Sequence, residues 1–155
     1  MAKVNPIPEG YHSVTPYLSI KGAAKAIDYY KQVFGATELF RMAAPDGKIG
    51  HAEIKIGNSP IMIADEFPEM EFVSPQTLGG SPIGLMIYVD DVDTMFNKAI
   101  SAGATQVKPL QDQFYGDRSG TLKDPFGHVW TVATHVEDVA PEELQKRAAA
   151  AHGGS

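Results

Sequence analysis

Apolar and polar residues alternate at every position over several short stretches of this chain and follow a helical spacing over two longer ones. In the first half, residues 14–20 alternate, and residues 22–35 place Ala23, Ile27, Tyr30 and Phe34 on one helical face. Three more short stretches that predict strands follow at 37–43, 49–56 and 59–65, separated by the turn sequences APDGK and GN. This half therefore predicts a strand, a helix that ends at Gly35, and three strands.

The second half repeats this order of elements. Residues 83–89 predict a strand, and the next stretch predicts a helix with Asp90 or Asp91 as its N-cap and an apolar stripe formed by Val92, Met95, Phe96, Ala99 and Ile100. The triplet GAT directly follows each predicted helix, at 35–37 and 103–105, so the halves superpose at an offset of about 68 residues. We expect an α+β fold of two tandem βαβββ modules whose strands form a curved mixed sheet.

The expected organisation is one domain over residues 1–155. Module one covers 12–66 and module two covers 83–136, with a linker rich in Pro, Gly and Ser at 67–82. A terminal helix is expected over 141–151, with Pro141 in its first turn.

Composition and charge exclude several classes of function. The formal charge of −6 and the absence of a basic patch argue against a nucleic-acid partner, because such binding depends on clustered Lys and Arg. The chain has no cysteine, which excludes disulfides, thiolate catalysis and Cys-based zinc sites. No apolar run approaches the roughly 20 residues of a membrane span, and the first residues lack a secretory pattern. We expect a cytoplasmic protein with no membrane partner.

Strand parity assigns two faces to the predicted sheet. An apolar set is expected to face the helices: Val14, Leu18, Ile20, Ala52, Ile54, Ile56, Leu85, Ile87, Val89, Trp130 and Val132. The opposite parity is mixed, aromatic and polar, as in a ligand cleft: Thr15, Tyr17, Ser19, His51, Glu53, Lys55, Gly84, Met86, Tyr88, Thr121, Val129, Thr131, Ala133 and His135. We therefore expect a small organic ligand on this second face.

The duplicated pattern resembles the vicinal oxygen chelate superfamily over residues 12–136. That superfamily includes glyoxalase I, extradiol dioxygenases, fosfomycin-resistance proteins and bleomycin-resistance proteins. The segments TPYLSIKGAAKAIDYYKQVFGA, GHAEIKIGNSPIMIADE, YVDDVD and FYGDRSGTLKDPFGHVW are similar to its PhnB-like branch. The resemblance implies the glyoxalase/bleomycin-resistance/dihydroxybiphenyl dioxygenase fold, but fold alone does not fix an activity.

Enzymes of the superfamily bind a divalent metal through a His on the first strand of each module and a carboxylate on the last strand of the second. The resemblance maps these positions to Thr15, Gly84 and Thr131. None is a usual anchor for a divalent ion, which takes imidazole, carboxylate or thiolate ligands. We therefore predict no metal and no other cofactor at these positions.

His51 and Glu53 are the candidate catalytic residues. At i and i+2 they point to the same side of a strand, and they fit either metal-free ligand contacts or an acid/base pair. A displaced divalent metal site is a second alternative, with a third ligand from His12, Glu66 or His135. A third is an exposed strand face with a structural hydrogen bond.

Residues 112–130 are the stretch richest in candidate side chains. Asp124 to Gly127 has the chemistry of a turn, and Trp130 has the parity of the core. Phe114, Tyr115 and Arg118 offer a stacking surface and an anion-binding fork, whereas Asp117 and Arg118 together could equally be an intramolecular brace. The predicted ligand-binding set is Thr15, Tyr17, Met86, Tyr88, Phe114, Tyr115, Arg118 and Thr131.

Three functions follow from these features. The first is a metal-independent protein of the bleomycin-resistance type that binds a planar small molecule, as a homodimer. The second is a lyase, isomerase or dioxygenase-type enzyme that uses His51 and Glu53, with or without a displaced metal. The third is an interaction domain that associates through the Ala-rich terminal helix.

Overall fold

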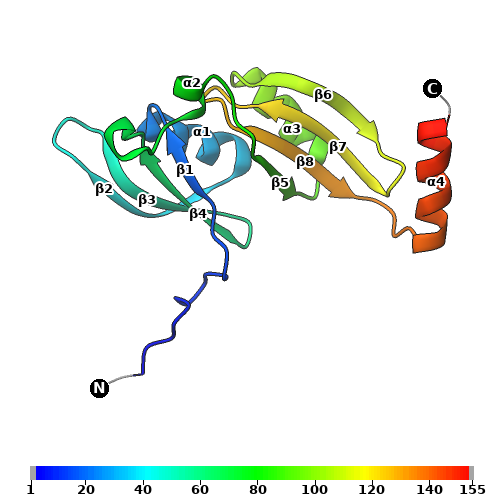
Figure 1. Cartoon of the computed structure of the whole chain (residues 1–155), viewed down its shortest axis with the longest axis horizontal. Helices are drawn as coiled ribbons and strands as arrows, with labels where there is room; N and C mark the ends of the chain where they lie inside the picture. Colours follow the sequence, from blue (N-terminus) through cyan, green and yellow to red (C-terminus); the bar gives the residue numbers. More distant parts are fainter. Residues whose placement is uncertain (1–2, 154–155) are drawn as a thin grey trace. The chain divides into compact units, whose positions relative to one another are not determined.

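The computed structural model describes residues 3–153 and divides into two compact units. Unit 1 is Met1–Gly80 and unit 2 is Ser81–Ser155. The boundary lies within the predicted linker, and each unit has its own sheet and helix (Figure 1). No helix within residues 3–153 combines the length and the apolar composition that crossing a bilayer requires.

Unit 1 contains a four-stranded mixed sheet and the long helix that covers it. Its elements are β1 (Tyr17–Ile20), α1 (Ala23–Phe34), β2 (Thr37–Ala43), β3 (Ile49–Ile56) and β4 (Ser59–Asp65). The strand order is β1-β4-β3-β2, with β1 parallel to β4 and the other pairs antiparallel. The predicted strands at 37–43, 49–56 and 59–65 are therefore confirmed.

The ends of α1 are set by groups that satisfy its free backbone atoms. Gly35 has φ 67° and its N–H donates to the Tyr30 carbonyl, which confirms the predicted end of the helix. At the other end, Asp65 Oδ1 accepts from the backbone N–H groups of Gly22 and Ala23, both at 3.0 Å. The end of β4 thus fixes the start of α1.

The core of unit 1 follows the predicted parity. Ala52, Ile54 and Ile56 are buried on the face of the sheet that α1 covers. The prediction for Val14 is wrong, since its side chain is 84% exposed. β1 begins only at Tyr17, because Pro16 has no N–H to donate to a ladder, although its carbonyl accepts from Met62.

The predicted linker contains two short helical elements, the 3₁₀ turn η1 (Pro68–Met70) and the α-helix α2 (Pro75–Leu78). Buried Ser74 caps α2 by accepting from the Thr77 N–H at 3.3 Å.

Unit 2 repeats the architecture of unit 1. Its elements are β5 (Gly84–Tyr88), α3 (Val92–Ser101), β6 (Thr105–Asp112), β7 (Asp117–Lys123), β8 (Val129–His135) and α4 (Pro141–Gly153). The strand order is β5-β8-β7-β6, with β5 parallel to β8. The predicted α+β class with a duplicated βαβββ pattern is confirmed, as two four-stranded mixed sheets.

The core of unit 2 lies between α3 and its sheet. Trp130, predicted as core, is fully buried, and its Nε1 donates to Asp124 Oδ2 at 2.8 Å. A Cβ on Gly120 would lie 2.7 Å from the Phe96 ring of α3, so the packing of α3 on the sheet favours glycine there. Asp91 is the N-cap of α3, accepting from the Thr94 N–H at 3.2 Å.

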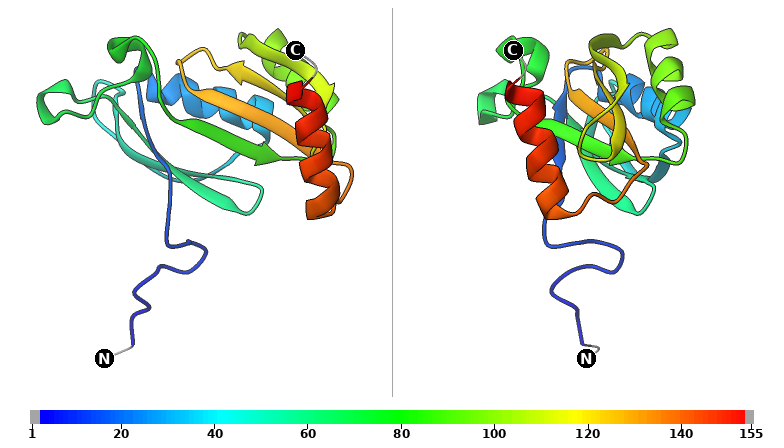
Figure 2. Two further views of the ribbon diagram at one scale, coloured as in Figure 1. Left: turned by 45° about the vertical axis from the view of Figure 1, so that its right-hand side comes forward. Right: turned by 90° about the vertical axis from the view of Figure 1, so that its right-hand side faces the viewer.

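α4 lies beside the turn between β6 and β7 (Figure 2). Arg147 donates to Glu137 and to the carbonyl of Phe114, and the Phe114 and His152 rings lie 6.5 Å apart. The predicted terminal helix is thus present and begins at Pro141.

Candidate functional site

A chain of three polar side chains lies on the face of the unit 1 sheet opposite α1. The Tyr17 hydroxyl lies 2.6 Å from His51 Nδ1, and His51 Nε2 lies 3.0 Å from Glu53 Oε2. In the strand order β1-β4-β3, the Tyr17 side chain must cross β4 to reach β3. Thus three residues that share strand parity in the sequence are joined into one network.

The chemistry of these groups fixes the direction of the hydrogen bonds. An ionised carboxylate only accepts, so Glu53 requires a proton on His51 Nε2. In a neutral imidazole, Nδ1 is then an acceptor, and the Tyr17 hydroxyl donates to it. Burial raises the pKa of the Tyr17 phenol above its ordinary value, which keeps this donor protonated. The remaining lone pairs of the Tyr17 oxygen are available to a further hydrogen-bond donor.

Tyr17 also lines a pocket of about 970 Å³ within unit 1. The pocket lies between the β2–β3 turn, the start of β3, the end of β4 and the segment around η1: Ala44, Asp46, Lys48, Ile49, Gly50, Ala64, Asp65, Glu66, Phe67, Met70 and Phe72. The rings of Tyr17 and Phe72 meet edge to face at 5.4 Å. This volume is within the range of roughly 300–1,000 Å³ that ligand sites have. His51 and Glu53 are outside the lining, so Tyr17 connects the polar chain to the pocket.

Unit 2 carries a related arrangement. The Tyr88 hydroxyl donates to Asp117 Oδ2 at 2.9 Å, across β8, and His135 Nδ1 lies 2.8 Å from Asp117 Oδ1. His135 Nε2 lies 2.7 Å from Asp138. The hydrogen bond to Asp117, followed by that to Asp138, raises the pKa of His135. In this unit the group bonded to the tyrosine is a buried carboxylate, and the imidazole of His135 lies between that carboxylate and Asp138.

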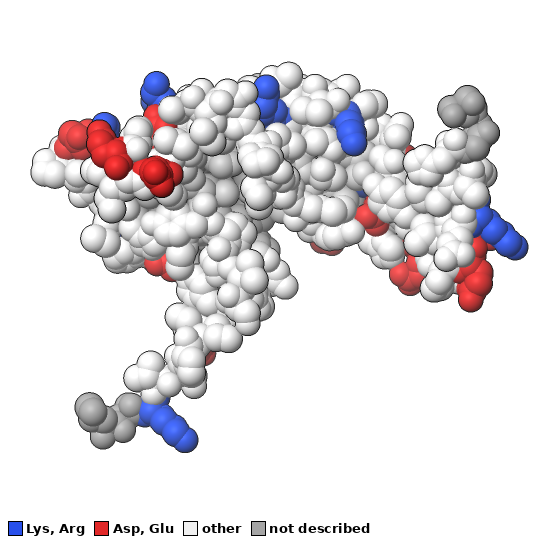
Figure 3. Space-filling model, viewed as in Figure 1, with Lys and Arg blue, Asp and Glu red and all other residues white. Residues whose placement is uncertain are grey.

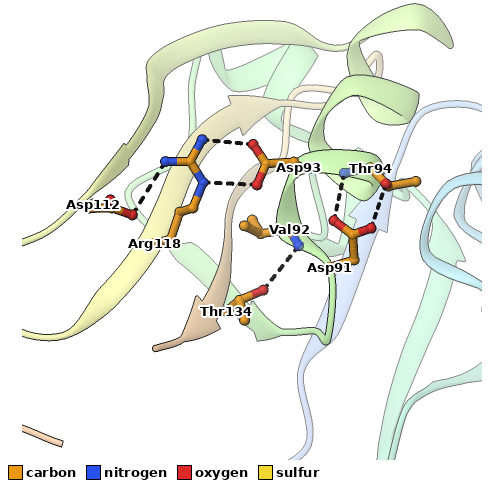
Figure 4. A network of polar contacts seen from close by, with 7 residues as sticks. All are labelled: Asp91, Val92, Asp93, Thr94, Asp112, Arg118 and Thr134. Carbon is orange, nitrogen blue, oxygen red and sulfur yellow. Dashed lines mark hydrogen bonds and ion pairs between the residues drawn. The ribbon is translucent and has the colours of Figure 1, made fainter. Parts of the chain in front are cut away.

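Arg118 forms an intramolecular brace in the structure, the alternative that the sequence leaves open beside ligand contact, although its partner is Asp93 and not Asp117. Its guanidinium forms a two-pronged pair with Asp93 at 2.7 and 2.9 Å and reaches Asp112 at 3.4 Å (Figure 4). These carboxylates, Asp93 first, raise the pKa of Arg118 further above its usual range. β7 begins at Asp117, so Arg118 has the parity of Gly120 and Leu122 and faces α3.

The other predicted ligand contacts are distributed over both units. Phe114 and Tyr115 form the turn between β6 and β7, where their rings meet edge to face at 5.3 Å. Met86 is partly exposed on β5, and Thr15 lies half-buried before β1. Thr131 pairs with Thr121 through hydroxyls 2.9 Å apart. None of these five predicted contacts lines the unit 1 pocket.

The positions that the family resemblance assigns to a metal do not fit a divalent ion. Thr131 shares its hydroxyl with Thr121, Gly84 has no side chain, and Thr15 offers only a hydroxyl. Among residues 3–153, no group of three or more His, Cys, Asp and Glu side chains is placed to hold a metal. We therefore derive no chemical step through a metal.

The residues proposed as a third ligand beside His51 and Glu53 have other surroundings. Glu66 accepts from Ser74 N and Thr77 Oγ1, and His135 is paired in unit 2. His12 is exposed before β1.

Sequence reasoning missed the segment that closes the pocket. Phe67 and Phe72 flank η1, and their backbones exchange hydrogen bonds at 2.6 and 3.2 Å in an isolated bridge. The aromatic spacing in DEFPEMEF was the available signal, but this segment was read only as a linker. Lys48 was likewise read only as part of a turn.

Comparisons with known proteins agree with this architecture. The model of the family described as Glyoxalase/Bleomycin resistance protein/Dioxygenase superfamily matches residues 12–132. The Mycobacterium bovis protein Mb0911c is 42% identical over 136 residues, which cover 86% of this chain and 90% of the relative.

Two solved structures are similar in fold to this chain. TioX from Micromonospora sp. ML1 is 27% identical with a TM-score of 0.63, covering 83% of this chain and 100% of TioX. A PhnB protein from Bacillus cereus is 18% identical with a TM-score of 0.64, covering 79% and 99%. The PhnB neighbour supports the predicted branch at the level of the fold.

Proposed function

The chain belongs to the glyoxalase/bleomycin resistance protein/dioxygenase superfamily, and we propose that it binds a small organic molecule in the pocket of unit 1 without a metal ion. The observation that carries this proposal is the pocket of about 970 Å³ with aromatic walls from Tyr17, Phe67 and Phe72. Such walls favour a planar apolar body through stacking and edge contacts. The hydroxyl of Tyr17 adds a polar group at a fixed position, as ligand sites commonly do.

Fluorescence of N-phenyl-1-naphthylamine tests the proposal, because this neutral dye brightens when it enters an apolar site. We expect saturable binding by the purified full chain. Phe72→Ala should weaken it about tenfold by removing one wall. Phe40→Ala is the matched control, since Phe40 is 47% exposed in the same unit and outside the lining. No saturable binding, or an equal loss in both variants, would refute the proposal.

Metal independence has its own test. Dialysis against a chelator should leave the dye affinity unchanged, because the residues at Thr15, Gly84 and Thr131 supply no metal ligand set. Loss of binding on chelation that is restored by a stoichiometric divalent ion would show that this part of the proposal is wrong.

Acid–base catalysis is a second candidate function, favoured by the Tyr17–His51–Glu53 chain. Tyr17 can take a proton from a bound ligand while its own proton moves to His51 Nδ1, and the Glu53 carboxylate stabilises the resulting imidazolium. Compounds found to bind should then exchange an acidic C–H proton in D2O, measured by NMR. The exchange should disappear in a His51→Ala, Glu53→Ala double variant. Equal exchange in that variant, or none with the native protein, would exclude this function.

We also propose that the protein is a cytoplasmic homodimer. Partly exposed apolar side chains on the open sheet faces, such as Met42 and Tyr88, support self-association. The absence of cysteine supports a reducing compartment. Sedimentation of the full chain and of a chain lacking residues 141–155 tests association: a dimer in both is expected, and a monomeric full chain would contradict it. A dimer lost only on truncation would instead assign association to α4.

A further inference from the structure

The pocket of unit 1 carries an excess of negative charge. Among the described residues that line it, the carboxylates are Asp46, Asp65 and Glu66, and the cation is Lys48. Figure 3 shows acidic side chains gathered on unit 1 over the segment that carries η1, where Glu69 and Glu71 follow Glu66 in the sequence. A ligand that enters this pocket therefore meets a negative potential.

Hydrogen bonds from the fold hold two of these carboxylates in place in the pocket wall. Asp65 accepts from three backbone N–H groups, two at the start of α1 and one from Ile49 at 2.6 Å. Glu66 accepts from Ser74 N at 3.0 Å and from Thr77 Oγ1 at 2.9 Å. These bonds, led by the one from Ser74 N, lower the pKa of Glu66. The negative charge thus belongs to the folded architecture of the pocket wall.

The uncharged part of the wall suits the same kind of ligand. With a neutral His51 that donates to the Glu53 carboxylate, Tyr17 donates its proton to His51, and the Tyr17 oxygen then presents an acceptor to the pocket. The rings of Tyr17, Phe67 and Phe72 present π-electron density, which attracts cations as well as apolar groups.

We propose that the pocket of unit 1 selects an organic cation, a protonated amine carried on a planar apolar body. The ammonium group supplies hydrogen-bond donors for the Tyr17 oxygen and a charge that complements the carboxylates. The apolar body packs against the aromatic walls. This assignment rests on the proposed ligand-binding function and adds the charge class of the ligand to it.

Three naphthalene compounds of similar size test the proposal by calorimetry with the full chain. They are 2-(1-naphthyl)ethylamine, which is cationic at neutral pH, 2-(1-naphthyl)ethanol, which is neutral, and 1-naphthaleneacetate, which is anionic. We expect the amine to bind at least about tenfold more tightly than the acetate, with the alcohol between them.

The outcomes separate the two proposals. Equal affinities, or tighter binding of the acetate, would overturn the cation assignment and leave ligand binding intact. Absence of binding by all three, together with no binding of N-phenyl-1-naphthylamine, would refute the proposed function itself.

Charge variants with matched controls test whether the charges of this pocket determine the affinity for the amine. Asp46→Asn keeps the side-chain oxygen that accepts from Lys48 N at 3.0 Å, so the turn is preserved while the charge is lost. We expect about fivefold weaker binding of the amine, whereas Asp28→Asn on the exposed face of α1 should have no effect. Lys48→Gln should strengthen amine binding about fivefold, and Lys55→Gln at the other end of β3 should not. Equal effects in variant and control would contradict the proposal.

Discussion

Asp124→Asn should cost unit 2 about 2–4 kcal/mol of unfolding free energy, because one buried carboxylate organises the turn before β8. Asp124 Oδ1 accepts from the backbone N–H groups of Phe126 at 2.9 Å and His128 at 3.0 Å. Its Oδ2 accepts from Trp130 Nε1 at 2.8 Å. The residue is 3% exposed, so water cannot replace a lost partner.

The magnitude follows from the number of acceptors. Asparagine has one oxygen and one NH₂ group, so either orientation directs an NH₂ at a donor: at the indole N–H of Trp130 or at the backbone N–H groups of Phe126 and His128. A hydrogen bond to a charged group contributes about 1.5–3 kcal/mol, and a buried donor left unsatisfied costs about 1–3 kcal/mol. These contributions overlap, which gives the expected range of about 2–4 kcal/mol.

Urea unfolding followed by Trp130 fluorescence measures this loss, because the chain has a single tryptophan and it is fully buried in unit 2. Asp46→Asn is the control, since Asp46 accepts a backbone hydrogen bond from Lys48 N in an exposed turn. It should change stability by less than about 0.5 kcal/mol. A loss below about 1 kcal/mol for Asp124→Asn would refute the assignment of this carboxylate as the centre of the turn.

Three further predictions concern unit 2. Gly120→Ala should destabilise unit 2 by about 1–3 kcal/mol, because the added Cβ would press on the Phe96 ring of α3. An unchanged urea unfolding curve would contradict this packing. His135 has a raised pKa in the folded state, so its ion pairs contribute fully below about pH 6.5, its ordinary value, and are lost as the pH rises through the folded pKa. The stability difference between wild type and His135→Asn should therefore be larger at acid than at alkaline pH, and a pH-independent difference would argue against it. A double-mutant cycle of Arg118→Gln and Asp93→Asn, measured by urea unfolding, should give a favourable coupling free energy between the two side chains that falls as the salt concentration rises. A coupling free energy of zero at low salt would show that the brace does not stabilise unit 2.

Much of the fold can be predicted from the sequence because apolar residues recur at a different spacing in strands than in helices. Alternation placed Ile54 and Trp130 in the core, and both are fully buried. Turn and cap chemistry fixed element ends, as at Gly35, whose positive φ ends α1. The repeated GAT triplet indicated the duplication, and the two strand orders are equivalent.

The sequence leaves two roles open for Arg118, ligand contact and an intramolecular brace, because it does not fix where the strand around this residue begins. β7 begins at Asp117, and the period of two then directs Arg118 to the helix side with Leu122. Asp117, read as its partner, instead accepts from Tyr88 and pairs with His135.

The site in unit 1 required information that parity does not contain. Parity placed Tyr17, His51 and Glu53 on one face, but their contact depends on β4 lying between β1 and β3, which is a property of the strand order. The pocket depends on Phe67 and Phe72, in a segment whose Pro, Gly and Ser residues predict a linker. The polar network and the pocket both depend on contacts between segments that lie far apart in the sequence.

The most direct test of ligand binding in unit 1 is a map of backbone amide shifts on titration with 2-(1-naphthyl)ethylamine, recorded as ¹H–¹⁵N spectra of the full chain. The account predicts that the largest changes fall at Tyr17 and within residues 44–50 and 64–72, which line the pocket. Changes concentrated on the strands of unit 2, or scattered over the surface without saturation, would contradict it.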